Sequence, residues 1–262
     1  MKRRVLAGIC LIVGCAFLIG LAPAANALEF GARAYYWYPM LKADLRVDTE
    51  LIPGTEMNLK DDLGIGNKGI PSVEAFLGTD KHHLSLMYTT VDYSGESRIG
   101  RNIRFMGKSY AANALVESDF KLQMLDLEYQ YDLVNMENIL AGFSLGLIGK
   151  IKYIDADVQL VSNTAGSVNN WEQSVAVPIP MVGVGAHIGL LAKILEARAK
   201  ITGIGYSGHM FYDAMADVSV TPFPFLDIHG GYRIMKLKID GISDVYGDVE
   251  FSGPYVGLTV GF

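Results

Sequence analysis

Charged and apolar residues alternate along several stretches of this 262-residue chain, and the charged positions are the ones that could do chemistry. In ILEARAKITG, Glu196, Arg198 and Lys200 fall on every second position, with apolar residues between them. Successive side chains of a β-strand point to opposite faces, so this spacing places the three charges on one face. Carboxylates and cations that share a face can form ion pairs or bind a charged solute.

The same alternation elsewhere gives a set of charged residues that we expect to face the inside of a barrel. They are Arg33, Asp126, Glu128, Lys150, Lys152, Glu196, Arg198, Lys200, Asp213, Asp217 and Arg233, with Glu29, Glu74 and Asp132 as further acidic candidates. A structural network of salt bridges is the favoured interpretation, because an unpaired charge in a narrow interior is costly. The alternative is a charged constriction that selects solutes.

The apolar positions of the same segments are expected to face lipid. They are Leu125, Leu127, Ala197, Ala199, Ile201, Val256, Leu258, Val260 and Phe262. The last four belong to YVGLTVGF, so the final segment carries an apolar ladder up to its terminal aromatic residue. Such a face is what a strand in contact with a bilayer requires.

Counting the alternating segments predicts about ten β-strands, with eight as the alternative. Short separators lie near Asp80, Asn135, Ala192 and Pro222, longer ones cover 39–68, 97–115 and 161–170, and one of modest length covers 240–245. Tight turns on one rim and long loops on the other are typical of outer-membrane barrels.

Pro178 and Pro180 would remove hydrogen-bond donors from a sheet, so we expect the strand there to bend or to begin beyond them.

Alternation by itself fits both a closed barrel in lipid and a soluble β-sandwich. Three features favour the barrel: a signal peptide, the asymmetry of the turns, and aromatic residues near strand ends. These aromatic residues are Tyr35, Tyr36, Trp37 and Tyr38 in one group and Phe223 and Phe225 in a tight turn. In hydrocarbon every backbone N–H and C=O needs an internal partner, which helices and closed barrels supply. We therefore predict an all-β fold, a closed antiparallel transmembrane β-barrel over 28–262.

Residues 1–27 have the form of a cleaved signal peptide. MKRR supplies a positive start, the run from Val5 to Leu21 is apolar and uncharged, and Ala25-Asn26-Ala27 is a small-x-small cleavage site. Lipid attachment at Cys15, within LIVGC, is an alternative. Cleavage after Ala27 would remove both cysteines of the chain, which would leave no disulfide and no thiolate metal ligand.

The charge balance argues against nucleic-acid binding. The full chain has a net charge of −6, and removing Lys2, Arg3 and Arg4 from its 22 basic residues leaves 19 against 28 acidic ones, a net charge of −9. No basic stripe is present to follow a phosphate backbone. The acidic segment 39–68 lacks the ligand spacing of a calcium loop, so we interpret it as a solvated loop and predict neither a metal nor a cofactor.

Five histidines raise the possibility of an outer-rim hydrolase, either a protease or a lipid A or phospholipid hydrolase. Only His209 is expected near the outer rim, with Ser207 before it and Asp213 four residues later. Along one strand His209 and Asp213 lie ~13 Å apart, so a dyad needs help from a neighbouring strand. We predict no catalytic residue, and a hydrolase that uses His209 remains the alternative.

The signal peptide, the even-numbered meander and YVGLTVGF with Phe262 at its end resemble Gram-negative outer-membrane β-barrel proteins, in particular the small OmpA and OmpX type. NLKDDLGIG and FSGPYVGL also resemble an uncharacterised group of exported barrels. The resemblance implies location in the bacterial outer membrane. It also implies that the barrel-assembly machinery reads the C-terminal strand. The strand count departs from the eight of the OmpA type, so function does not transfer from that type.

The expected function is that of a non-enzymatic outer-membrane barrel, either structural or a narrow solute channel. A wide porin is excluded because eight to ten strands enclose little more space than their own side chains fill. Surface adhesion through the long loops is a further alternative. The segment from Arg101 to Tyr110, with Arg104 and Lys108, is the candidate for such binding. The expected partner is the outer-membrane bilayer.

Overall fold

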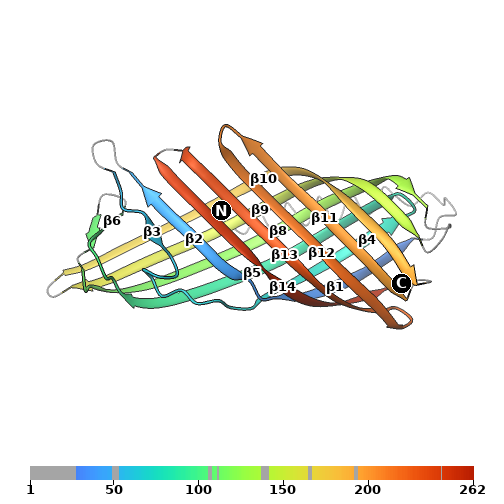
Figure 1. Ribbon diagram of the computed structural model, residues 1–262, viewed down its shortest axis with the longest axis horizontal. Helices are drawn as coiled ribbons and strands as arrows, with labels where there is room; N and C mark the ends of the chain where they lie inside the picture. Colours follow the sequence, from blue (N-terminus) through green and yellow to red (C-terminus); the bar gives the residue numbers. More distant parts are fainter. Residues whose placement is uncertain are drawn as a thin grey trace, which may run out of the picture.

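Ten strands form a closed antiparallel barrel in the computed structural model, which describes residues 28–48, 53–105, 108–110, 112–136, 142–164, 167–191, 194–242 and 244–262 (Figure 1). In order around the wall, the strands are β1 (Glu29–Trp37), β4 (Ile70–Thr79), β5 (His82–Arg98), β8 (Leu115–Asn135), β9 (Phe143–Thr164), β10 (Ser167–Leu191), β11 (Leu195–Tyr206), β12 (His209–Phe223), β13 (Leu226–Ile242) and β14 (Val245–Gly261). Pairing of β1 with β14 closes the barrel, which confirms the predicted fold and strand number. The predicted signal peptide lies outside the described residues.

Four shorter strands lie outside this ring. After a break at Tyr38 and Pro39, β2 (Met40–Val47) continues the line of β1 and pairs with the other half of β14. β3 (Met57–Asn58) pairs with β2, and β6 (Ile103–Phe105) with β7 (Lys108–Tyr110) forms a small hairpin. In the part of the chain that the structure describes, no helix is long and apolar enough to cross a membrane.

The wall is uneven in height. β9 and β10 contain 22 and 25 residues, whereas β11 contains 12. β9 and β10 therefore extend well past the end of the β11–β12 hairpin, toward the left of Figure 1. The prediction of a long loop at 161–170 is wrong, because β9 continues to Thr164 and β10 begins at Ser167.

The two prolines of β10 also correct the prediction of a bend or a later start. Pro178 and Pro180 both stay in register with β9. On the other side, pairing of β10 with β11 begins only at Val182. This open edge explains why prolines are tolerated there, because a strand edge without a neighbour has no ladder hydrogen bond to lose.

The outer surface of the barrel is apolar. Of the predicted lipid-facing residues, Leu127, Ile201, Val256, Leu258, Val260 and Phe262 have exposed fractions of 39–62%, while Ala199 is exposed and Leu125 and Ala197 are half-buried. Aromatic rings gather at the short-turn end, where Phe225 and Phe262 stack at 5.2 Å. A closed barrel with this exterior is the form in which outer-membrane proteins cross the bilayer, and the protein lies in the bacterial outer membrane.

The aromatic group at the end of β1 is divided by the strand alternation. Tyr36 and Tyr38 are exposed on the outside, in the manner of an interfacial girdle. Tyr35 and Trp37 point inward and are buried. The expectation that all four mark the membrane surface therefore holds for two of them, because neighbouring residues of a strand face opposite sides.

Candidate functional site

The interior of the barrel has three levels, which are the candidate functional site. The middle level, here called the central charge layer, consists of Asp126, Glu128, Lys150, Lys152, Asp213 and Arg233. An apolar plug fills the interior toward the long loops. A polar cavity, here called the turn-side cavity, lies toward the short turns. Because short turns face the periplasm in outer-membrane barrels, this cavity is on the periplasmic side.

The central charge layer is closed by ion pairs that cross the lumen. Lys152 Nζ lies 2.6 Å from Asp126 Oδ2 on the adjacent β8 and 3.2 Å from Asp213 Oδ2 on β12. Lys150 Nζ lies 3.3 Å from the same Asp213 oxygen. β9, which carries both lysines, is separated from β12 in the wall by β10 and β11, so these contacts span the interior. At this level, ion pairs therefore connect opposite sides of the barrel.

Arg233 is the third cation of the central charge layer. Arg233 donates from Nε to Asp213 Oδ1 at 3.0 Å and from Nη2 to Asp213 Oδ2 at 2.7 Å, a two-point contact between β13 and β12. The three cations of the layer balance its three carboxylates, and exposed fractions of the six side chains are only 0–9%. Pairing of this kind is what allows charges to be buried at all.

The apolar plug comes from the first long loop, which folds into the barrel. Met57, Leu59, Leu63 and Ile65 are buried and cluster with interior strand residues such as Tyr93. A Cβ atom at Gly95 of β5 would clash with the backbone carbonyl oxygen of Leu63. The loop can approach the barrel wall this closely because glycine has no side chain. The expectation of a solvated loop at 39–68 is wrong for this part of it.

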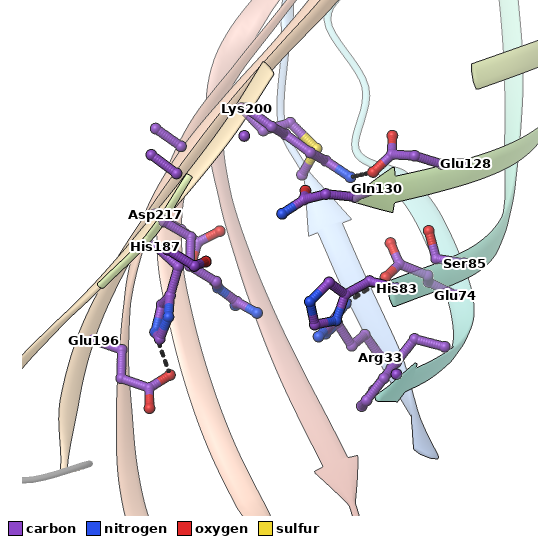
Figure 2. Close-up of a pocket in the computed structure, with 18 of the residues that line it drawn as sticks. Arg33, Glu74, His83, Ser85, Glu128, Gln130, His187, Glu196, Lys200 and Asp217 are labelled. Atoms are coloured by element: carbon purple, nitrogen blue, oxygen red, sulfur yellow. Dashed lines mark hydrogen bonds and ion pairs between the residues drawn. The ribbon is translucent and has the colours of Figure 1, made fainter. Parts of the chain in front are cut away.

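The turn-side cavity has a volume of about 480 Å³. Its charged lining consists of Glu29, Arg33, Glu74, His83, Glu128, His187, Glu196, Arg198, Lys200 and Asp217. In Figure 2, His187, Glu196 and Asp217 lie on one side of the cavity and Glu74, His83 and Glu128 on the other. Lys200 Nζ on β11 lies 2.6 Å from Glu128 Oε1 on β8, a contact that crosses the lumen and joins the cavity to the central charge layer.

The ion pairs of this cavity expose their cations more than their anions. Arg33 pairs with Glu74 at 2.6 Å, Arg198 with Asp217 at 3.1 Å and His83 with Asp132 at 3.1 Å. In these pairs and in Lys200–Glu128, the side chain of the arginine, lysine or histidine is 21–36% exposed and that of the carboxylate 1–9%. Two pairs differ: His187 and Glu196, 3.3 Å apart, are similarly exposed, and His229, 3.5 Å from Asp217, is fully buried.

The structure places all eleven predicted interior charges on the inner face and divides them between the two levels. Six form the central charge layer. Arg33, Glu196, Arg198, Lys200 and Asp217 line the turn-side cavity. Sequence reasoning did not pair His83, His187 and His229 with the carboxylates that they contact, which are Asp132, Glu196 and Asp217. Each histidine falls on an inward position of its strand, which is the signal that would have placed them beside carboxylates.

The geometry around His209 differs from that of a catalytic dyad. His209 Nδ1 accepts a hydrogen bond from the backbone N–H of Asp240 at 3.0 Å. Asp213 belongs to the central charge layer, where Arg233 and both lysines hold it. Among the described residues, no group of three or more His, Cys, Asp or Glu side chains is arranged to hold a metal ion.

The loop candidate for adhesion is partly tied down by contacts within the chain. Arg101 donates from Nη2 to the Glu56 carbonyl oxygen at 2.7 Å and to Asp62 Oδ2 at 3.0 Å. Arg104 and Lys108 belong to the β6–β7 hairpin. Arg101 therefore connects the long loop between β5 and β8 to the first long loop, between β1 and β4.

Comparison with known proteins shows likeness in architecture only. No family model and no curated protein matches the chain. Neisserial surface protein A matches 88% of this chain and 96% of its own, with 14% identity and a TM-score of 0.35. Ail of Yersinia pestis, in complex with a heparin analogue, covers 90% and 99% with 10% identity and a TM-score of 0.39. The translocator domain of the autotransporter NalP from Neisseria meningitidis covers 98% and 95% with 14% identity and a TM-score of 0.42.

Proposed function

We propose that this protein is a non-enzymatic, non-conducting barrel that anchors an uneven extracellular wall in the outer membrane. The observation that carries this proposal is the pairing of Lys150 and Lys152 with Asp213 across the lumen. A solute would have to break these buried contacts. Breaking a buried pair leaves an uncompensated charge and costs ~3–5 kcal/mol.

A second barrier supports the closed state. The apolar plug lies between the central charge layer and the long loops, and its residues are buried. An ion entering that level would lose its hydration without gaining a polar partner. A path for ions therefore needs rearrangement at both levels.

The tall wall is the part of the barrel that is suited to surface contacts. On the outer face of β9, apolar Ile151 and Tyr153 give way to Asp155 and Asp157 farther along the strand. Polar outward residues mark the point where a strand leaves the apolar band of the bilayer. The wall beyond that point, together with the loop hairpin, would present a binding surface to the exterior.

Single-channel recording in a planar bilayer tests the closed state. We expect the refolded mature chain to be silent, and steady discrete openings would contradict the proposal. Replacing 57–65 with glycine and serine at constant length, combined with Lys150→Ala and Asp213→Ala, should produce openings. Lys236→Ala with Asp248→Ala removes an ion pair outside the lumen and should stay silent. Heat-modifiable migration in gels would show that each variant folds.

A narrow channel is the second candidate, and one observation favours it. The turn-side cavity already reaches Glu128 of the central charge layer, so part of a path through the barrel is open. In that case the wild-type chain would show openings whose size changes with Lys200→Gln. The surface role has its own test: cells displaying the chain should self-aggregate or attach to a surface more than cells with a variant that lacks 101–110.

A further inference from the structure

In the turn-side cavity, Arg33, Arg198 and Lys200 are each more exposed than the carboxylates with which they pair. We propose that it binds the oxyanion of a small organic ligand from the periplasm, either a carboxylate or a phosphate ester. The inference does not depend on whether the barrel conducts. It follows from the partners of each charged group in the cavity wall.

The deeper carboxylates have their oxygens occupied. Asp217 accepts from Arg198 on Oδ1 and from the Tyr255 hydroxyl on Oδ2, at 3.1 and 2.6 Å. Glu128 faces Lys200 with Oε1, at 2.6 Å, and Lys150 with Oε2, at 3.5 Å. Each oxygen of these two carboxylates therefore has at least one polar contact, and an exposed fraction of 9% for each side chain limits the approach of a ligand donor.

Asp132 follows the same pattern. Its Oδ1 accepts from Gln130 Nε2 at 2.7 Å, and its Oδ2 lies 3.1 Å from His83 Nε2. The side chain of Asp132 is 1% exposed, whereas that of His83 is 36% exposed. The ring therefore covers the carboxylate on its cavity side.

The cations keep free donors. An ammonium group has three donors, and Lys200 Nζ uses one on Glu128. Arg33 donates from Nη1 to Glu74, and its Nε, which has no hydrogen-bond partner, is buried out of reach of a ligand. Its guanidinium also lies 3.9 Å from the Phe76 ring centre, which holds the group in place. Fixed guanidinium and ammonium donors beside a cavity are suited to oxyanions.

The volume of the cavity and the residues that line it limit the kind of anion that can bind. A volume of about 480 Å³ is in the range of small-molecule sites. Tyr35, Phe76 and Met215 add apolar surface, so an organic anion fits better than a bare ion. Glu29 and Glu196, near the turn-side ends of their strands, are the accessible carboxylates. They favour a singly charged anion, or one with a cationic group at its outer end.

The test uses the full mature barrel in micelles, with methyl-labelled methionine observed by NMR. Met215 lines the cavity, whereas Met57 is buried in the apolar plug and serves as an internal control. Benzoate, phenyl phosphate and benzylamine are the probes, because they share one ring and differ in the charged group. We expect benzoate or phenyl phosphate to shift the Met215 signal and leave Met57 unchanged, with about tenfold weaker binding of benzylamine.

Variants then locate the site. Lys200→Gln should weaken the better anion about tenfold, the loss of one charge-assisted contact. The control Lys42→Gln removes an exposed lysine paired with Glu250 at 3.4 Å and should bind normally. Tighter phenyl phosphate than benzoate would identify phosphate esters as the ligand class, and the reverse would identify carboxylates.

Three results would overturn the inference. They are no Met215 shift with either anion, equal affinity for benzoate and benzylamine, or unchanged anion binding in folded Lys200→Gln. The comparison of probes on the wild-type chain needs no variant, so it decides the question even where a variant does not fold. Conductance is not a readout here, so failure of this site leaves the closed-barrel proposal standing.

Discussion

Removing Asp213 should cost far more stability than removing an aspartate in an exposed ion pair. Asp213 accepts both donors of Arg233, and Lys150 and Lys152 lie 3.3 and 3.2 Å from its Oδ2. In Asp213→Ala the central charge layer keeps three cations against two carboxylates, in a part of the interior where side chains are only 0–9% exposed. Breaking a buried pair in this way costs ~3–5 kcal/mol of unfolding free energy.

Asp248→Ala is the matched control. Asp248 also pairs with a lysine on a neighbouring strand, Lys236 at 3.1 Å, but its side chain is 43% exposed. Exposed pairs contribute ~0–1 kcal/mol, so the control should lose little. Urea unfolding in lipid vesicles, followed by tryptophan fluorescence, measures both variants. Asp213→Ala combined with Arg233→Met should recover part of the loss, because the uncompensated cation is gone. Equal losses in Asp213→Ala and Asp248→Ala would refute the reasoning.

Three further predictions concern the wall, the plug and assembly. Leu258→Arg should cost ~2–4 kcal/mol if it lies near the bilayer midplane, and vesicle folding without loss would contradict its lipid-facing position. Gly95→Val should destabilise by ~1–3 kcal/mol because its side chain meets the loop backbone at Leu63, whereas Gly230→Ala, with open space around it, should change urea unfolding little. Phe262→Ala should lower the amount of folded barrel in cells but not refolding in vesicles, since we propose that the assembly machinery reads this end; equal loss in both would argue against that reading.

Much of the barrel wall was predictable because successive side chains of a strand alternate between its two faces. The repeat separates Lys200 and Arg198 from Ala199 and Ile201, and the structure puts the first pair inside and the second outside. The same rule separates Tyr36 from Trp37, which are neighbours in sequence and lie on opposite faces. Strand number followed from counting these repeats. Alternation is a local pattern, so a single segment is enough to show which of its side chains share a face.

The contacts that close the interior could not be predicted in this way. Lys150 and Asp213 are 63 residues apart on strands that are not neighbours, and they meet because closure of the wall brings opposite faces together. The apolar plug likewise depends on curvature, since a loop folds inward only where the ring leaves a space of its size. Alternation tells which way a side chain points, but the distance across the barrel is set by ten strands acting together. Sequence therefore determined the two faces of this protein, and the closed ring decided which charges on the inner face became partners.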